Sequence, residues 1–284
     1  MVAGSWVVWA SFLSAGGTLA LLWYVWGYRE KPGAGWFLLS LLGQFVWSVG
    51  YGTALLVHEP TIRWALEIVV WTAMAGLIAA FVAFALEYTG RTTIRDRGGL
   101  ALVAAAPLAT VTATNPINGL AWSGFAIDPV AGLATVSYDL ETWAVFGTTA
   151  GVLMASLASL LLFDTVLSYG RLYRSEAIAV GLSTIPPSVA LLVWLYDLGP
   201  VPQLSFVTVF FLPHIVLDAY AFVGSDMFEF HPATRRAGER AAIEDLGNPV
   251  IIVDERDRVV TLNAAATDVL QVDKRAVTTQ ALST

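Results

Sequence analysis

The chain has 284 residues, of which 57 % are hydrophobic and 13 % are charged, and its formal net charge is −7. Because an ordinary soluble domain carries about 25 % charged residues, this composition indicates a membrane protein. The acidic balance excludes nucleic acid as an expected partner, since a phosphate-binding surface needs clustered Lys and Arg. The absence of cysteine excludes disulfides, thiolate metal sites and cysteine nucleophiles.

Seven stretches of the chain are mainly apolar over about 20 residues, the length at which a helix crosses a bilayer. They cover residues 5–28, 34–57, 64–88, 98–114, 141–169, 176–196 and 203–224. The fourth is short and contains Pro107, so its pattern is the weakest. The first lacks a cleavable signal's positive start and small-residue cleavage site, so we expect it to remain as a helix. The predicted fold class is an all-α membrane protein, a seven-transmembrane helix bundle over residues 1–224.

Small and aromatic residues within these stretches have structural explanations. Five glycines are expected to let helix backbones approach closely: Gly16, Gly17, Gly43, Gly76 and Gly151. Tryptophans and tyrosines near the ends of the stretches are expected to anchor the helices at the membrane surface.

The connections between the spans carry Lys and Arg unevenly, which predicts the orientation of the chain. Ten basic residues fall in the first, third and fifth connections and after the seventh span: Arg29, Lys31, Arg91, Arg95, Arg97, Arg171, Arg174, Arg235, Arg236 and Arg240. The remaining connections carry Arg63 alone, together with several acidic residues. Because basic loops stay in the cytoplasm, we expect a multi-pass plasma-membrane protein with its N-terminus outside and its C-terminus in the cytoplasm.

The longest outer connection, residues 115–140, contains two strand-like runs, GFAID and LATVSYD, separated by a proline and a glycine. This pattern predicts a small β-hairpin that caps the bundle. Whether the cap shapes a ligand entrance or only covers helix ends stays open at this point.

Hydrophobicity falls after Gly224, and the remaining residues read as a cytoplasmic tail. Residues 225–247 are predicted to form a linker, with a short amphipathic helix over residues 233–247. Residues 248–284 then read as a strand, a polar turn, a second strand and the start of a helix, an α+β pattern. Because so short a segment rarely folds alone, we expect either a fragment of a longer chain or a tail completed by another segment.

Ionisable residues at membrane depth are candidates for function, because burying a charge there costs several kcal/mol. Glu87 and Asp164 lie near the predicted cytoplasmic ends of spans, where pairing with Arg91 and Arg171 explains them. Glu67 lies one helical turn from Arg63, so an i, i+4 ion pair is the simplest expectation.

His214 and Asp218 form a different kind of candidate in the seventh span. They are spaced i, i+4 on one helix face and follow Pro213 directly, so a titratable pair would lie beside carbonyls that the proline frees. We treat these two residues, with Glu67 and Asp164, as candidates for signal sensing or relay.

Several functional classes conflict with the sequence. A retinal protein needs a lysine in its last span, but no lysine lies between Lys31 and Lys274. The three histidines lie in separate regions, and no phosphate-binding loop or catalytic triad is visible, so neither a cofactor nor a catalytic residue is expected. An odd number of spans and few charges also argue against a transporter.

The end of the third span carries the sequence FALEYTGR, residues 84–91. The residue types predict that Phe84 to Leu86 finish a lipid-facing run and that Glu87 and Tyr88 reach the membrane surface. Gly90 suits the left-handed residue that closes a helix, and Arg91 opens the most basic loop.

This motif supports a resemblance when it is combined with the TNPINGLAW run at residues 114–122. Together with the segment 171–199, these stretches resemble the N-terminal seven-helix region of histidine kinases, and PVIIVDERDRVVTLNAAATDVL resembles the start of a PAS domain. The residues that carry the two motifs are Glu87, Tyr88, Thr89, Gly90, Arg91, Thr114, Asn115 and Trp122. The family is associated with a histidine where Asn118 stands, so a role of that imidazole does not carry over.

The resemblance implies a sensory input module that passes a signal through the bilayer to a PAS domain and a kinase. It also implies that the parent protein is a homodimer through its cytoplasmic region and phosphorylates a response regulator. The kinase itself is implied only for a longer parent, and the ligand is not identified by the sequence. The competing interpretation is a small-molecule transporter or a seven-helix receptor with a non-kinase output.

Overall fold

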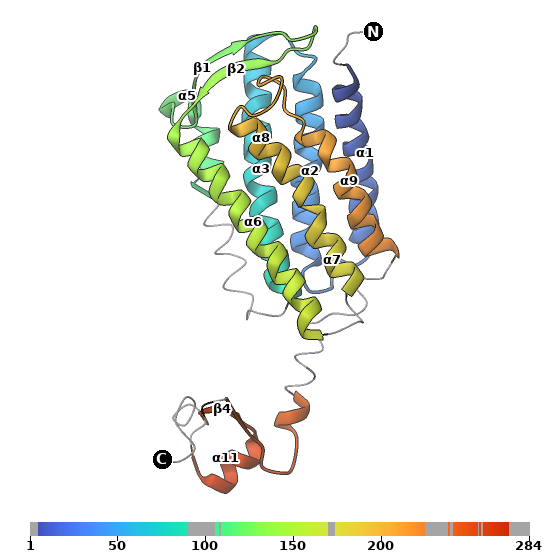
Figure 1. The fold of residues 1–284 in the computed structure, drawn as a ribbon, viewed down its shortest axis with the longest axis vertical. Helices are drawn as coiled ribbons and strands as arrows, with labels where there is room; N and C mark the ends of the chain where they lie inside the picture. The colour runs from blue at the N-terminus through green and yellow to red at the C-terminus, as the bar shows by residue number, and fades with distance from the viewer. Residues whose placement is uncertain are drawn as a thin grey trace. The chain divides into compact units, whose positions relative to one another are not determined.

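The computed structural model describes residues 5–89, 106–107, 109–169, 174–224, 238, 241–254, 256 and 258–272. The chain divides into two compact units, Met1–His231 and Pro232–Thr284. Within the first unit, long helices lie side by side, and a two-stranded hairpin covers one end of them, which we call the hairpin end (Figure 1).

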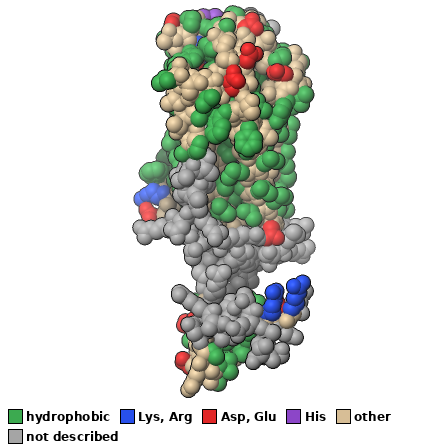
Figure 2. Space-filling model, turned by 90° about the vertical axis from the view of Figure 1, so that its left-hand side faces the viewer, with side chains coloured by type: hydrophobic (Ala, Val, Ile, Leu, Met, Phe, Trp, Pro, Cys, Tyr) green, Lys and Arg blue, Asp and Glu red, His purple; other side chains and the backbone are tan. Residues whose placement is uncertain are grey.

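Six helical segments in the described part of the chain are long and apolar enough to cross a membrane. They are formed by the helices α1 (Ser5–Trp26), α2 (Ala34–Ala54), α3 (Pro60–Tyr88), α6 (Thr142–Tyr169), α7 (Arg174–Ser183), α8 (Ile185–Leu195) and α9 (Val207–Ala219) with its π-helical continuation η2 (Tyr220–Gly224). These segments confirm six of the seven predicted spans, and the fourth, 98–114, lies mostly outside the described residues. Figure 2 shows hydrophobic side chains over the helices and acidic side chains gathered at the hairpin end.

The helix boundaries differ from the expectation where local capping decides them. α3 begins four residues earlier than predicted because the Glu59 carboxylate accepts hydrogen bonds from the N–H groups of Thr61 and Ile62 at 3.1 and 2.6 Å. The same two bonds lower the pKa of the Glu59 carboxyl, the bond from Ile62 more than that from Thr61. The sixth span breaks into α7 and α8 at Thr184, because two prolines follow in the first turn of α8.

Close approach of helix backbones explains one of the five glycines noted in the sequence, and packing against a side chain explains two more. A Cβ atom on Gly43 would lie 3.0 Å from the Leu77 Cβ and 3.1 Å from the Ala73 carbonyl oxygen, so α2 and α3 touch there. Gly17 packs against the Ile215 side chain of α9, and Gly151 packs against the Ile78 side chain of α3. For Gly16 and Gly76, however, no described residue lies within 4 Å of such a Cβ atom, so the described part of the chain gives these two no close helix contact.

The predicted hairpin is present. Strands β1 (Trp122–Ile127) and β2 (Val136–Leu140) pair antiparallel, with a bulge between Ser123 and Ala126. Gly124 adopts a φ of 66° inside the bulge, a conformation that favours glycine. The Ala134 N–H donates to the Leu55 carbonyl at 2.8 Å, which ties the hairpin to the end of α2.

The second unit contains the strands and the helix that the sequence predicts. β3 (Ile251–Val253) and β4 (Val259–Leu262) pair antiparallel, and α11 (Ala264–Leu270) follows at once. Asn263 joins these elements, because its Oδ1 accepts from the Val250 and Ala266 N–H groups at 2.8 and 3.0 Å. Of the helix predicted over residues 233–247, residue 238 and residues 241–244 are helical, and most of its remaining residues lie outside the described part.

Candidate functional site

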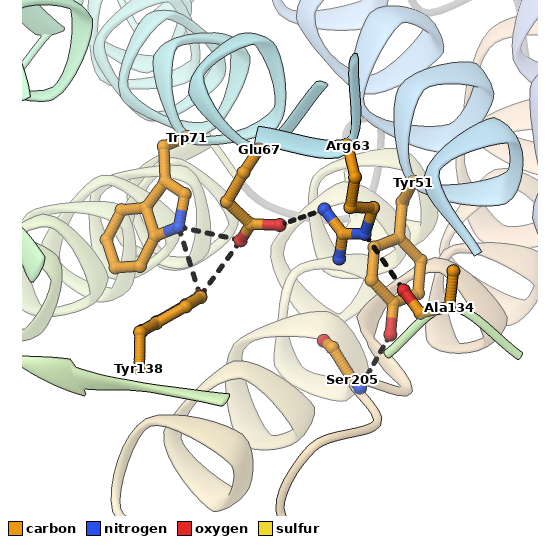
Figure 3. A network of polar contacts seen from close by, with 7 residues as sticks. All are labelled: Tyr51, Arg63, Glu67, Trp71, Ala134, Tyr138 and Ser205. Atoms are coloured by element: carbon orange, nitrogen blue, oxygen red, sulfur yellow. Dashed lines mark hydrogen bonds and ion pairs between the residues drawn. The ribbon is translucent and has the colours of Figure 1, made fainter. Parts of the chain in front are cut away.

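A buried charge pair lies at the hairpin end of α3. The Arg63 side chain is 1 % exposed, and its Nη1 donates to Glu67 Oε2 at 2.6 Å, which confirms the ion pair expected from their spacing. The Arg63 Nε also donates to the Ala134 carbonyl at 2.9 Å. Because Ala134 lies in the hairpin, this arginine joins α3 to the cap (Figure 3).

The second carboxylate oxygen of Glu67 accepts hydrogen bonds from two aromatic side chains. Glu67 Oε1 accepts from the Tyr138 hydroxyl at 2.9 Å and from the Trp71 indole N–H at 3.1 Å. Tyr138 comes from β2, so the carboxylate contacts both the hairpin and its own helix (Figure 3). Burial raises the pKa of the Tyr138 phenol well above its usual value of 10, and the Glu67 charge adds to this shift.

A neighbouring contact extends the network to the beginning of α9. The N–H of Ser205, just before α9, donates to the Tyr51 hydroxyl of α2 at 2.7 Å. Farther along α9, the hydroxyls of Thr208 and Ser11 lie 2.7 Å apart, and the Ser14 hydroxyl donates to the Thr208 carbonyl at 2.6 Å. Polar contacts with α1 and α2 therefore hold the first turns of α9.

The C-terminal half of α9 contains the predicted His214 and Asp218 pair. The His214 Nε2 lies 3.4 Å from Asp218 Oδ2, and the Asp218 side chain is 0 % exposed. The His214 Nδ1 and both carboxylate oxygens are buried without a hydrogen-bond partner in the described part of the chain. α9 continues through Pro213, which has no N–H to offer the Val209 carbonyl, and passes into the π-helical turn η2.

The FALEYTGR motif lies in an aromatic cluster at the end opposite the hairpin. Phe84 is 0 % exposed and Tyr88 1 % exposed, so the expectation of a lipid-facing Phe84 is wrong, while the position of Tyr88 at the membrane surface stays a prediction. The Phe84 ring centroid lies 5.0 Å from that of Phe37 in α2, and Phe37 in turn lies 4.2 Å from Phe222 in η2. Gly33, at a φ of 81°, packs against Phe84 where a Cβ atom would approach it to 3.3 Å.

The remaining residues of that motif complete the end of α3. Thr89 caps the helix, and its hydroxyl donates to the Ala85 carbonyl at 2.8 Å. Glu87 is half-buried, while its expected partner Arg91 and the closing Gly90 lie outside the described residues. Asp164 is half-buried in α6, and its expected partner Arg171 also lies outside them.

The TNPINGLAW run folds into the corner that starts the hairpin, around the one-turn helix α5 (Asn115–Asn118). Asn115 donates to the Trp122 carbonyl at 2.9 Å and accepts from the N–H groups of Ala121 and Trp122 at 2.8 and 3.1 Å. Asn118 donates to the Thr114 hydroxyl at 2.8 Å. These motif residues therefore shape the chain, and Trp122 is packed against Trp71 at a centroid distance of 5.4 Å.

The sequence-predicted candidates occupy separate places. Glu67 lies in the network at the hairpin end, and His214 and Asp218 lie together in α9. Among the residues that the structure describes, no group of three or more His, Asp or Glu could hold a metal ion. Tyr138 and Trp71 were missed, because their meeting at Glu67 depends on tertiary contacts that a linear pattern does not contain.

No curated protein matches the sequence of this chain. A family model described as the N-terminal 7TM region of histidine kinase matches residues 10–232, more than three quarters of the chain. The match includes both sequence motifs, the hairpin and the described membrane helices from residue 10 of α1 onward. The chain therefore belongs to the family of N-terminal seven-transmembrane regions of histidine kinases.

Proposed function

We propose that the chain is the membrane input module of a two-component histidine kinase, which relays a signal across the bilayer to a cytoplasmic PAS and kinase output. Family membership supports this function, and so does the strand, turn, strand and helix order of the second unit, which fits the start of a PAS domain. Phosphorylation of a response regulator and dimerisation through the cytoplasmic region belong to the longer parent protein.

One observation carries the proposal furthest. The family motif at the end of α3 packs, through Phe84 and Phe37, against Phe222 of η2, the last described turn of the first unit. Because packed aromatic rings have few alternative arrangements, a shift of α2 or α3 displaces η2 and the linker after it. The signal then acts by favouring one packing of the bundle over another, which requires different affinities for the two packings.

The candidate residues take different parts in this relay. Glu67 and its partners hold the hairpin to α3 and define the end of the bundle that we place outside the cell. His214 and Asp218 lie in α9 between its anchored first turns and η2, so a change in their interaction reaches the output segment directly. Asp164 is proposed as a contact of α6 near the cytoplasmic side.

Replacement of Asp218 by Asn in the full-length parent kinase tests the relay. The variant keeps the shape of the side chain but removes its negative charge, and we expect the basal autophosphorylation rate in lipid vesicles to change at least about fivefold. The matched control is Asp139→Asn on the exposed face of β2, which leaves that rate unchanged.

Three outcomes separate the possibilities. An unchanged rate in a folded Asp218→Asn protein removes the pair from the relay but leaves the input module intact. A coding sequence without a kinase core downstream of Thr284 contradicts the kinase output, and solute uptake by vesicles that contain the chain supports a transporter instead.

A further inference from the structure

A cavity of about 60 Å³ lies within the membrane bundle, between α2, α3, α6, α8 and α9. Four aromatic side chains form much of its wall: Phe37, Trp47, Phe81 and Phe211. One water takes up about 10–15 Å³ of such a cavity, so the cavity has room for about four to six non-hydrogen atoms. An apolar wall of this kind favours a small organic molecule over a cluster of waters.

The polar side chains around the cavity are mostly engaged within the protein. The Ser40 hydroxyl donates to the Phe37 carbonyl at 2.7 Å, and the Gln44 amide donates to the Thr18 hydroxyl at 2.9 Å. The Thr184 hydroxyl donates to the Gly181 carbonyl at 3.0 Å. His214 also lines the cavity, but its Nδ1 is buried without a partner among the described residues.

Asp218 determines which hydrogen bonds the His214 ring can make to a ligand. A carboxylate 3.4 Å from Nε2 favours the proton on that nitrogen, which leaves Nδ1 as an acceptor in the neutral ring and a donor in the charged ring. A hydroxyl group can donate and accept, so it satisfies Nδ1 in either state. The chemistry of Nδ1 therefore matches a small alcohol.

The described residues do not fully enclose the cavity on α3 and α8. Ile78, Thr184 and Ser188, which line it on α3 and α8, are half-buried. α6 packs chiefly on α3 and α7 and makes little contact with α8. A small molecule can enter the cavity between these helices by passing the hydroxyl side chains of Thr184 and Ser188.

We propose that this cavity binds a small amphipathic molecule that carries a hydroxyl group. Its apolar body lies against the aromatic wall, and its hydroxyl bonds to Nδ1 of His214. Coupling of this site to the output rests on the proposed function, because an occupied cavity favours one position of α9. Binding itself does not depend on the output and is measured separately.

The experiment uses the full chain in lipid nanodiscs and 1-butanol as the probe. Nitrogen NMR follows the His214 ring, whose signals are assigned by their loss in His214→Gln. We expect a saturable shift of Nδ1 with 1-butanol. The matched probe 1-chlorobutane has the same number of non-hydrogen atoms but no hydroxyl, and we expect it to bind about tenfold more weakly.

Two variants on α6 locate the probe. Ala155 lines the cavity, so Ala155→Leu fills it and abolishes the shift. Leu157 is 61 % exposed on the same helix, so Leu157→Phe adds volume outside the cavity and keeps the shift. Ser188→Leu fills the cavity from α8 and replaces Ala155→Leu if that variant does not fold.

The outcomes are distinct. The absence of a saturable shift in the folded wild-type chain overturns the site, and so does a shift that persists in a folded cavity-filling variant. Equal affinity for the two probes overturns the hydroxyl contact with His214. A saturable shift without any change in the parent's kinase activity supports the site and contradicts only its coupling to the output.

Discussion

At the scale of single residues, the pair of Arg63 and Glu67 shows how hydrogen bonds stabilise a buried ion pair. Every oxygen of Glu67 is engaged, one by Arg63 and the other by Tyr138 and Trp71. A carboxylate that is fully hydrogen-bonded tolerates burial, whereas a carboxylate that loses its cation does not. The network is therefore expected to be sensitive to the removal of one partner.

Arg63→Met removes the positive charge and leaves Glu67 buried. We expect a loss of about 3–5 kcal/mol in the free energy of unfolding, measured by reversible denaturation in mixed micelles. The double variant Arg63→Met, Glu67→Met removes both charges, so it should lose less than the two single variants added together. A double variant whose loss equals that sum would show that the two residues do not interact.

Tyr138→Phe removes one donor to Glu67 and is expected to lower the free energy of unfolding by about 1–2 kcal/mol. The pKa of Tyr138 is raised in the folded state, so its contribution is complete below pH 10, the ordinary tyrosine value, and is lost as pH rises above it. The wild-type chain should therefore lose stability above pH 10 more steeply than Tyr138→Phe. Identical slopes for the two proteins would contradict this assignment.

At the scale of elements, helix packing in the bundle depends on a few small residues. Gly43→Ala places a Cβ against Leu77 and the Ala73 carbonyl, so α2 and α3 must move apart. We expect a loss of about 1–3 kcal/mol in the free energy of unfolding. The control is Gly76→Ala on α3, whose added Cβ meets no described residue within 4 Å and which should be neutral or slightly stabilising. Equal effects of the two variants would show that close approach at Gly43 contributes nothing.

The elements also show what sequence can predict in a membrane protein. Apolar runs located six spans, and the turn residues and β-branched residues located the hairpin and the strands of the second unit. The sequence does not predict which face of each helix packs inside the bundle and which faces the lipid. Lipid is as apolar as the bundle interior, so the apolar residues form no one-sided pattern. Phe84 was therefore assigned to the lipid although it is completely buried.

Some contacts of the candidate residues follow from local spacing in the sequence, and others depend on the tertiary fold. The ion pair of Arg63 with Glu67 and the pairing of His214 with Asp218 follow from i, i+4 spacing, which a sequence contains. The approach of Tyr138 to Glu67 joins residues 71 positions apart, and the aromatic contact of Phe37 with Phe222 joins still more distant ones. Such contacts are set by the tertiary arrangement and have no local signature.

At the scale of the whole molecule, the described residues place the two flanks of the fourth predicted span at opposite ends of the bundle. Arg63 contacts the hairpin, and α3 runs from there to Thr89, whereas Asn115 lies at the start of the hairpin again. One further crossing between Thr89 and Asn115 is what a seven-span topology requires. Together with the distribution of basic residues, this arrangement predicts a hairpin outside the cell and a C-terminus in the cytoplasm.

The chain contains no cysteine, so single cysteines can test this topology without background labelling. Ile117 is 88 % exposed at the hairpin end, and the Glu30 side chain is 87 % exposed in the connection at the opposite end. We expect a membrane-impermeant maleimide to label Ile117→Cys in intact cells and Glu30→Cys only after lysis. The opposite labelling pattern would reverse the orientation, and labelling of both in intact cells would contradict a membrane crossing between them.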